Sequence, residues 1–133
     1  MRLHHVGIVV DDICRHGASY AAQLTLRPLS PIVIDPIQRV QVQLWGDTHG
    51  PRLELIQPSE DFSPVSRFLK KGGGLSHLCF EVEDIVAAVE NARAEGAICL
   101  QDPVPAAAFG GRRVAFVIGR EIGLIEFLES PSR

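Results

Sequence analysis

The spacing of apolar and polar positions changes from segment to segment along the 133-residue chain. Residues 3–10 and 75–82 are rich in apolar positions of the kind that form β-strands. Each run ends in an acidic pair that can cap the start of a helix. Apolar residues then recur at helical spacing through 13–24, where Gly17 weakens the pattern, and through 85–92, before Gly96. The pattern therefore predicts a strand followed by a helix, twice.

Three further strands are expected after each helix. Apolar runs bounded by turn residues place them at 28–34, 39–45 and 52–57, and again at 97–101, 113–118 and 123–128. The glycine-containing stretches 46–51 and 119–123 would form the matching turns before the last strand of each half. Between the halves, Ser63 and Pro64 predict a short helix reaching Leu69, and residues 70–74 (KKGGG) predict a flexible joint.

The two halves repeat each other in sequence at one offset without a gap. The offset is 72 residues, the difference between the histidines at 5 and 77 and between the glutamates at 54 and 126. It also pairs Leu3 with Leu75, Val10 with Val82, Asp12 with Asp84, Ile13 with Ile85 and Val42 with Val114. Such a fixed offset indicates a duplicated module, with boundaries at about 1–62 and 73–130 of a single domain.

The duplicated polar residues occupy defined faces of their strands, because side chains alternate across a strand. Val6, Ile8 and Val10 form an apolar face that we expect to pack under the helix, which leaves His5 on the other face. The same reasoning sets Glu54 opposite Leu53 and Leu55. It sets His77 opposite Leu78, Phe80 and Val82, and Glu126 opposite Ile125 and Phe127. If the two curved sheets join edge to edge, these polar residues converge inside a cup.

Two imidazoles and two carboxylates without a thiolate form a ligand set for Mn, Fe, Co, Ni or Zn. The sequence therefore predicts one divalent metal ion per chain, bound by His5, Glu54, His77 and Glu126. The alternative is a duplicated fold whose site is no longer functional. Retention of both residue types in register favours the metal site, because a solvated surface has no reason to keep them.

Composition excludes several classes of function. A net charge of −3 gives no reason to expect nucleic acid or an anionic membrane as partner. No apolar run approaches the roughly 18 residues of a membrane span, and the first residues do not resemble a signal peptide. The three cysteines lack paired spacing, so we expect no disulfide framework and a reduced, cytoplasmic protein.

With these residues in place, the chain resembles the vicinal oxygen chelate superfamily of glyoxalases, bleomycin-resistance proteins and dioxygenases. HHVGIVV near the start resembles the first metal-binding strand of that superfamily. The central block LELIQPSEDFSPVSRFLKKGGGLSHLCFEVEDI and the closing GLIEFLE resemble the methylmalonyl-CoA epimerases in particular. The resemblance implies an α+β fold in which two tandem βαβββ modules form a curved, cup-shaped mixed sheet. It also implies His5, Glu54, His77 and Glu126 as ligands, and a homodimer.

By this resemblance the function is that of a metal-dependent isomerase that removes a proton next to a carbonyl or thioester, with an acyl-CoA or another small acyl thioester as substrate. Glu126 or Glu54 would act as ligand and general base at once. Gln41 and Gln43 share a strand face and are expected to line the cup as substrate-binding residues. The alternatives are a glyoxalase-type lyase, a dioxygenase, or a protein that binds or sequesters a small molecule.

Simpler interpretations suit several other residues. His4 lies on the opposite strand face from His5 and is expected to face solvent, as is Glu81 at the end of its strand. Cys79 is interpreted as a small, partly buried filler. Arg112 or Arg113, after a glycine pair that forms a turn, could reach an anionic group of the substrate.

Overall fold

The computed structural model describes residues 1–47 and 49–132. They divide into two compact units, and the division passes through strands β1 (Arg2–Val9) and β6 (Gly74–Val82). We call His5–Ser76 the N-terminal unit, and Met1–His4 together with the chain from His77 onward the C-terminal unit. Each unit is described by itself.

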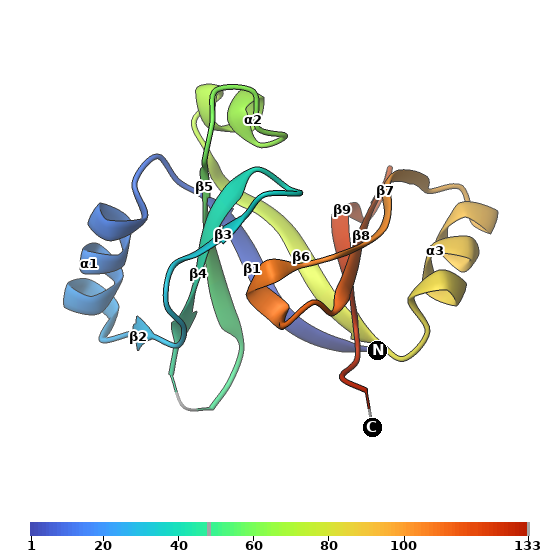
Figure 1. The fold of residues 1–133 in the computed structure, drawn as a ribbon, viewed down its shortest axis with the longest axis horizontal. Helices are drawn as coiled ribbons and strands as arrows, with labels where there is room; N and C mark the ends of the chain where they lie inside the picture. Colours follow the sequence, from blue (N-terminus) through green and yellow to red (C-terminus); the bar gives the residue numbers. More distant parts are fainter. Residues whose placement is uncertain (48, 133) are drawn as a thin grey trace. The chain divides into compact units, whose positions relative to one another are not determined.

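The N-terminal unit is a mixed sheet with helix α1 (Ile13–Leu24) packed on one face (Figure 1). Its other elements are β2 (Arg27–Pro28), β3 (Val33–Asp35), β4 (Val40–Gly46), β5 (Arg52–Pro58) and the short helix α2 (Ser66–Lys70). The strand order is β2-β4-β5-β1, and β3 pairs with β4. Strands β1 and β5 run parallel, whereas β4 is antiparallel to its neighbours.

The C-terminal unit repeats this plan with helix α3 (Ile85–Ala94) against its sheet. Its other elements are β7 (Ile98–Pro105), the 3₁₀ turn η1 (Ala107–Phe109), β8 (Arg113–Gly119) and β9 (Gly123–Glu129). The strand order is β6-β9-β8-β7, with β6 parallel to β9 and the remaining pairs antiparallel. The predicted α+β fold of strand, helix and three more strands, repeated twice, is confirmed.

The sequence repeat extends to the pairing of the strands. In the N-terminal unit Glu54 of β5 lies beside Gly7 of β1 and opposite Leu44 of β4. In the C-terminal unit Glu126 of β9 lies beside Cys79 of β6 and opposite Phe116 of β8. Each residue of the second set lies 72 positions after its counterpart in the first. The duplicated glutamates therefore occupy the same register position in both sheets.

Both long helices begin where the acidic pairs predict. The Asp12 carboxylate accepts a hydrogen bond from the Arg15 backbone N–H at 3.0 Å. The Asp84 carboxylate accepts the equivalent bond from Ala87 at 2.9 Å. Each bond satisfies an N–H that has no partner within the first turn of a helix.

No helix in the described part of the chain has both the length and the apolar character that crossing a membrane requires.

The apolar faces predicted from strand alternation pack under the helices in both units. Buried residues in the N-terminal unit are Ile8, Val10, Ile13, Trp45 and Leu55. The core of the C-terminal unit is made by the buried residues Val82, Ile85, Val89, Ala115, Val117, Ile125 and Phe127. The expectation for Leu78 is wrong, since this side chain is 40% exposed and lies outside that core.

Three predicted elements differ in the structure, and one of them is the strand expected at 97–101, which continues to Pro105 as β7. The expected strand 28–34 is divided into β2 and β3, because residues 29–32 leave the regular pairing around Pro31, which has no N–H to donate. The short helix starts at Ser66 rather than near Ser63, whose hydroxyl lies 3.5 Å from the Val65 N–H. The expected turn 46–51 contains Thr48, which lies outside the described residues.

The glycines of the predicted joint have a specific backbone role. Gly72, Gly73 and Gly74 have φ values of 119°, 66° and 93°, a region that favours glycine. A Cβ on Gly73 would also lie 2.6 Å from the carbonyl oxygen of Val9. The chain can therefore pass this close to β1 only with glycine at that position.

Candidate functional site

The first duplicated pair lies within the N-terminal unit on two adjacent parallel strands. His5 of β1 and Glu54 of β5 approach each other with Nε2 3.5 Å from Oε1. His5 has no exposed surface and Glu54 is 4% exposed. An imidazole and a carboxylate thus lie together in a place that water hardly reaches.

The C-terminal unit contains the same arrangement. His77 of β6 and Glu126 of β9 lie on adjacent parallel strands, and Nε2 of His77 lies 3.4 Å from Oε1 of Glu126. Both residues are buried, with 7% and 2% of their surface exposed. The two units therefore carry equivalent histidine–glutamate pairs, as the sequence repeat predicts.

Both glutamates lie on the sheet face that points away from the helix of their unit. Their neighbours along the strand, Leu55 and Phe127, pack in the helix-covered cores. Because side chains alternate along a strand, Glu54 and Glu126 point to the opposite face. The predicted orientation of the duplicated polar face is confirmed for these residues.

The chemistry and spacing of each pair suit metal binding. Two ligand atoms bound at about 2.1 Å to one ion, at angles between octahedral and tetrahedral, lie about 3.0–3.4 Å apart. The separation of 3.4 Å is at the upper end of this range, and that of 3.5 Å is just above it. Burial of a carboxylate is costly unless a cation compensates its charge. Each pair is therefore a candidate metal-binding group that could supply one nitrogen and one oxygen ligand.

The face expected for Gln41 and Gln43 is wrong. Gln43 lies opposite Leu55 in the β4–β5 ladder, and directly opposed residues share a face, so Gln43 belongs to the α1 side. Its amide oxygen accepts a hydrogen bond from the Trp45 indole N–H at 2.9 Å, and its NH₂ donates to the carbonyl of Ser30 at 3.1 Å. Gln41 lies two residues earlier on β4, so its side chain points to the same face as that of Gln43. The interpretation of both glutamines as substrate-binding residues thereby loses its basis.

Glu81 is held between two arginines rather than solvated, which corrects the sequence interpretation. Its carboxylate accepts hydrogen bonds from Arg2 at 2.9 Å and from Arg112 at 2.6 Å. Burial raises the pKa of Glu81, but the hydrogen bond and charge of Arg112, together with the charge of Arg2, hold the pKa below its usual value. A carboxylate so stabilised in its charged form is a poor general base.

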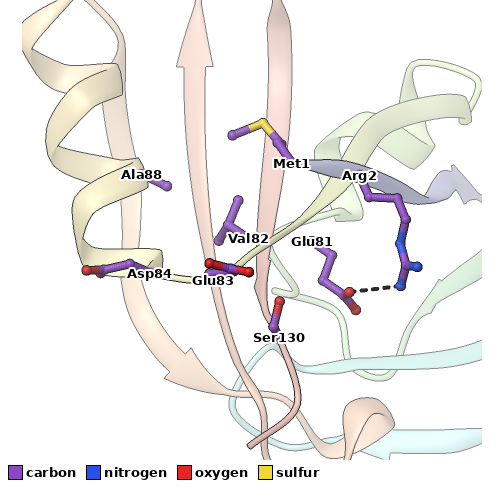
Figure 2. A pocket seen from close by; sticks show the side chains of 8 residues that line it. All are labelled: Met1, Arg2, Glu81, Val82, Glu83, Asp84, Ala88 and Ser130. Atoms are coloured by element: carbon purple, nitrogen blue, oxygen red, sulfur yellow. Dashed lines mark hydrogen bonds and ion pairs between the residues drawn. The ribbon is translucent and has the colours of Figure 1, made fainter. Parts of the chain in front are cut away.

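A surface hollow beside this ion pair is lined by Met1, Arg2, Glu81, Val82, Glu83, Asp84, Ala88 and Ser130 (Figure 2). Acidic side chains outnumber the single arginine in that lining, so the hollow does not suit an anionic ligand. Arg112 also donates to the carbonyl of Glu129 at 2.7 Å, and Arg113 donates to its carboxylate at 2.8 Å. Both arginines that were expected to reach an anionic substrate are therefore engaged within their own unit.

His4 is buried, contrary to expectation, and is 8% exposed. Its ring meets that of Phe109 edge-to-face, with centroids 5.4 Å apart and an interplanar angle of 89°. Sequence alternation could not predict this contact, because Phe109 comes from the distant turn η1. Cys79, expected to be partly buried, is fully buried among Ala106, Val114 and Leu128.

Comparison with known proteins defines the class. Residues 4–116 match the Glyoxalase/Bleomycin resistance protein/Dioxygenase superfamily, and the chain belongs to this superfamily. It is 34% identical over 118 residues to an ethylmalonyl-CoA/methylmalonyl-CoA epimerase of Cereibacter sphaeroides, covering 87% of both chains. It is 32% identical over 124 residues to the mitochondrial methylmalonyl-CoA epimerase of Homo sapiens, covering 92% of this chain and 69% of that one.

Solved structures agree with this classification. A hypothetical protein from Bacillus halodurans superimposes with a TM-score of 0.85 at 29% identity, covering 99% of this chain and 96% of that chain. A Streptomyces coelicolor methylmalonyl-CoA epimerase in complex with 2-nitronate-propionyl-CoA gives a TM-score of 0.86 at 24% identity, covering 99% of both chains, and this similarity shows the fold. The predicted superfamily, and the resemblance to the epimerases, are confirmed.

Proposed function

We propose that this protein is a metal-dependent epimerase that exchanges the proton on the carbon next to an acyl-CoA thioester. The substrate class is a 2-substituted malonyl-CoA, such as methylmalonyl-CoA or ethylmalonyl-CoA. One observation carries the proposal: a chain 34% identical to an epimerase of this type contains two buried histidine–glutamate pairs in equivalent register. Neither the sequence identity to the epimerase nor the histidine–glutamate geometry would identify the reaction alone. Both support metal-dependent proton exchange next to a thioester.

In this proposal His5, Glu54, His77 and Glu126 together hold one divalent ion of Co, Mn, Ni, Fe or Zn. The ion would act as a Lewis acid that stabilises negative charge on the thioester oxygen. The four residues supply two neutral nitrogens and two anionic oxygens, so their carboxylate charges would balance the charge of the ion. Each histidine must remain neutral to serve as a ligand.

The proton transfers are assigned to Glu126 and Glu54. One carboxylate takes the proton from the carbon next to the thioester, and a proton returned from the opposite side inverts that carbon. A carboxylate on each of two separate strands, β5 and β9, supports a division of these two steps. Glu81 is not assigned to either step, because Arg2 and Arg112 stabilise its charged form.

The proposal extends to the state of the protein in the cell. Resemblance to the family supports a homodimer, which light scattering of the purified protein would measure.

Cys14, Cys79 and Cys99 form no disulfide among the described residues, which is compatible with the reducing cytoplasm. Measurement of the free thiols would test this part of the proposal.

Deuterium exchange tests the reaction directly. The metal-loaded protein, incubated with methylmalonyl-CoA in heavy water, should introduce deuterium at the carbon between the two carbonyl groups, which mass spectrometry detects. A chelator should abolish the exchange, and Co²⁺ or Mn²⁺ should restore it. If no 2-substituted malonyl-CoA or other acyl thioester exchanges, while a small aromatic or glycopeptide ligand binds tightly without metal, the protein is a sequestering protein instead.

A variant identifies the general base. Glu126→Gln should slow exchange by about 10²- to 10⁴-fold even at saturating metal, because an amide cannot accept the proton. Glu129→Gln, on the same strand but pointing to Arg113, is the matched control and should exchange normally. A Glu126→Gln protein that recovers most of the rate once metal is saturating would show that another group is the base.

A further inference from the structure

Phe116 lies close to both members of the C-terminal pair. In the β8–β9 ladder it is directly opposite Glu126, so the two side chains share a face. Its ring meets the His77 imidazole edge-to-face, with centroids 5.3 Å apart and an interplanar angle of 85°. Phe116 is itself half-buried. A single aromatic ring therefore borders an imidazole and a carboxylate that lie 3.4 Å apart.

The orientation of an imidazole on a strand is not set by the backbone. The torsion that turns the ring about its bond to Cβ is broad and roughly two-fold, so several ring orientations have similar energies. A perpendicular aromatic ring at this separation is a favourable and direction-dependent contact. It disfavours rotation of the His77 ring away from the orientation in which Nε2 faces Glu126. An apolar neighbour also excludes water that would compete for the nitrogen.

The equivalent position in the N-terminal unit does not carry an aromatic ring. Leu44 lies opposite Glu54, 72 residues before Phe116. Leucine provides apolar contact but no ring with a preferred angle to an imidazole. The aromatic contact is thus a feature of the His77–Glu126 pair and is not a general requirement of the repeated fold.

We infer that Phe116 is a positioning residue for His77, and that its ring holds the imidazole with Nε2 directed toward Glu126. The consequence for metal affinity rests on the proposed function, in which His77 is a ligand. The orientation of the ring does not, because it follows from contacts within the C-terminal unit. The two statements can therefore fail separately.

The test compares Phe116→Leu, Phe116→Tyr and Phe109→Leu. The last is the matched control, because it removes an edge-to-face contact of nearly the same geometry from His4, in the same unit. Co²⁺ binding measured by calorimetry should weaken by about 3- to 10-fold in Phe116→Leu. Phe116→Tyr, which keeps the ring, should bind within about 2-fold of the wild type, and so should Phe109→Leu. Urea unfolding of the chelated proteins separates this loss from a general loss of stability.

Histidine NMR provides the second measurement on metal-free protein. The ring protons of His77 should shift in Phe116→Leu and lose the pattern of nuclear Overhauser contacts that reports one orientation, whereas Phe109→Leu should affect His4 instead. Unchanged His77 contacts, or unchanged Co²⁺ affinity in a Phe116→Leu protein whose wild type binds Co²⁺, would overturn the inference. If the wild type binds no Co²⁺, the proposed function fails, and the NMR result alone decides the role of Phe116.

Discussion

The two units fill the space between helix and sheet with different residues at equivalent positions. In the N-terminal unit Gly17 of α1 faces Trp45 of β4, and a Cβ on this glycine would lie 2.4 Å from the indole Cζ2. In the C-terminal unit the residues 72 positions later are Val89 and Val117, both buried in the same core. A very small and a very large residue in one unit thus correspond to two of intermediate size in the other.

The candidate ligand pairs differ far less than the cores. The separation of histidine nitrogen and glutamate oxygen is 3.5 Å in one unit and 3.4 Å in the other, in the same strand register. Cores tolerate exchanges that conserve total volume, whereas a ligand set requires particular atoms at particular positions. The contrast indicates that the two halves diverged in packing while the polar face kept its chemistry.

The largest effect should follow from removing a candidate ligand from either unit. His5→Ala and His77→Ala should each weaken metal binding by about 100-fold or more, since the proposed site needs a nitrogen from both units. Metal analysis and calorimetry measure the loss, and the metal-dependent rise in melting temperature should disappear with it. His16→Ala, whose side chain on α1 is 38% exposed, is the control. Equal metal content in His77→Ala and wild type would mean that the two pairs do not act together.

A smaller but clear effect is expected from Gly17→Ala. Alanine normally favours a helix by about 1 kcal/mol over glycine, but the clash with Trp45 should reverse the sign and destabilise the fold by about 1–3 kcal/mol. Urea unfolding measures the difference. Combining the change with Trp45→Leu should relieve the clash and reveal a coupling energy between the two sites. A Gly17→Ala protein that is more stable than the wild type would show that the indole moves aside freely.

The ion pairs of Glu81 with Arg2 and Arg112 have no counterpart in the N-terminal unit, because Val9 occupies the position equivalent to Glu81. Glu81→Gln should cost about 1–2 kcal/mol at pH 7 by weakening the bonds to Arg2 and Arg112. The pKa of Glu81 lies below its ordinary value of 4.5, so this stabilisation is present above that pH and is lost as pH falls through the lowered pKa. Unfolding at pH 7 and pH 3 should therefore show a difference that shrinks in acid. Exposed Glu83→Gln is the control and should leave the stability at pH 7 close to that of the wild type.

The smallest effect should be the same in both units. Asp12→Ala and Asp84→Ala each remove a helix-capping hydrogen bond and should each destabilise by about 1 kcal/mol, as measured by urea unfolding. Asp→Asn at either position keeps an oxygen acceptor and should cost less. A loss confined to one of the two variants would contradict the structural equivalence of the helix starts.

Much of this fold could be predicted from patterns in the sequence. The fixed offset between His5 and His77 and between Glu54 and Glu126 indicated the duplication, and strand alternation indicated the face on which the glutamates lie. The aspartates before each helix defined its start. The strand faces and helix starts depend on one residue and its near neighbours, because strand period and helix capping are local properties, whereas the duplication depends on a repeat across 72 residues.

The tertiary structure alone decided the features that depend on distant partners. Strand β4 has apolar residues on both faces, so the side on which Gln43 lies became clear only from its pairing with Leu55. The burial of His4 required Phe109, and the ring contact of His77 required Phe116, both far along the chain. The spacing of a strand fixes which side chains share a face, but what covers that face is decided by residues that folding brings there.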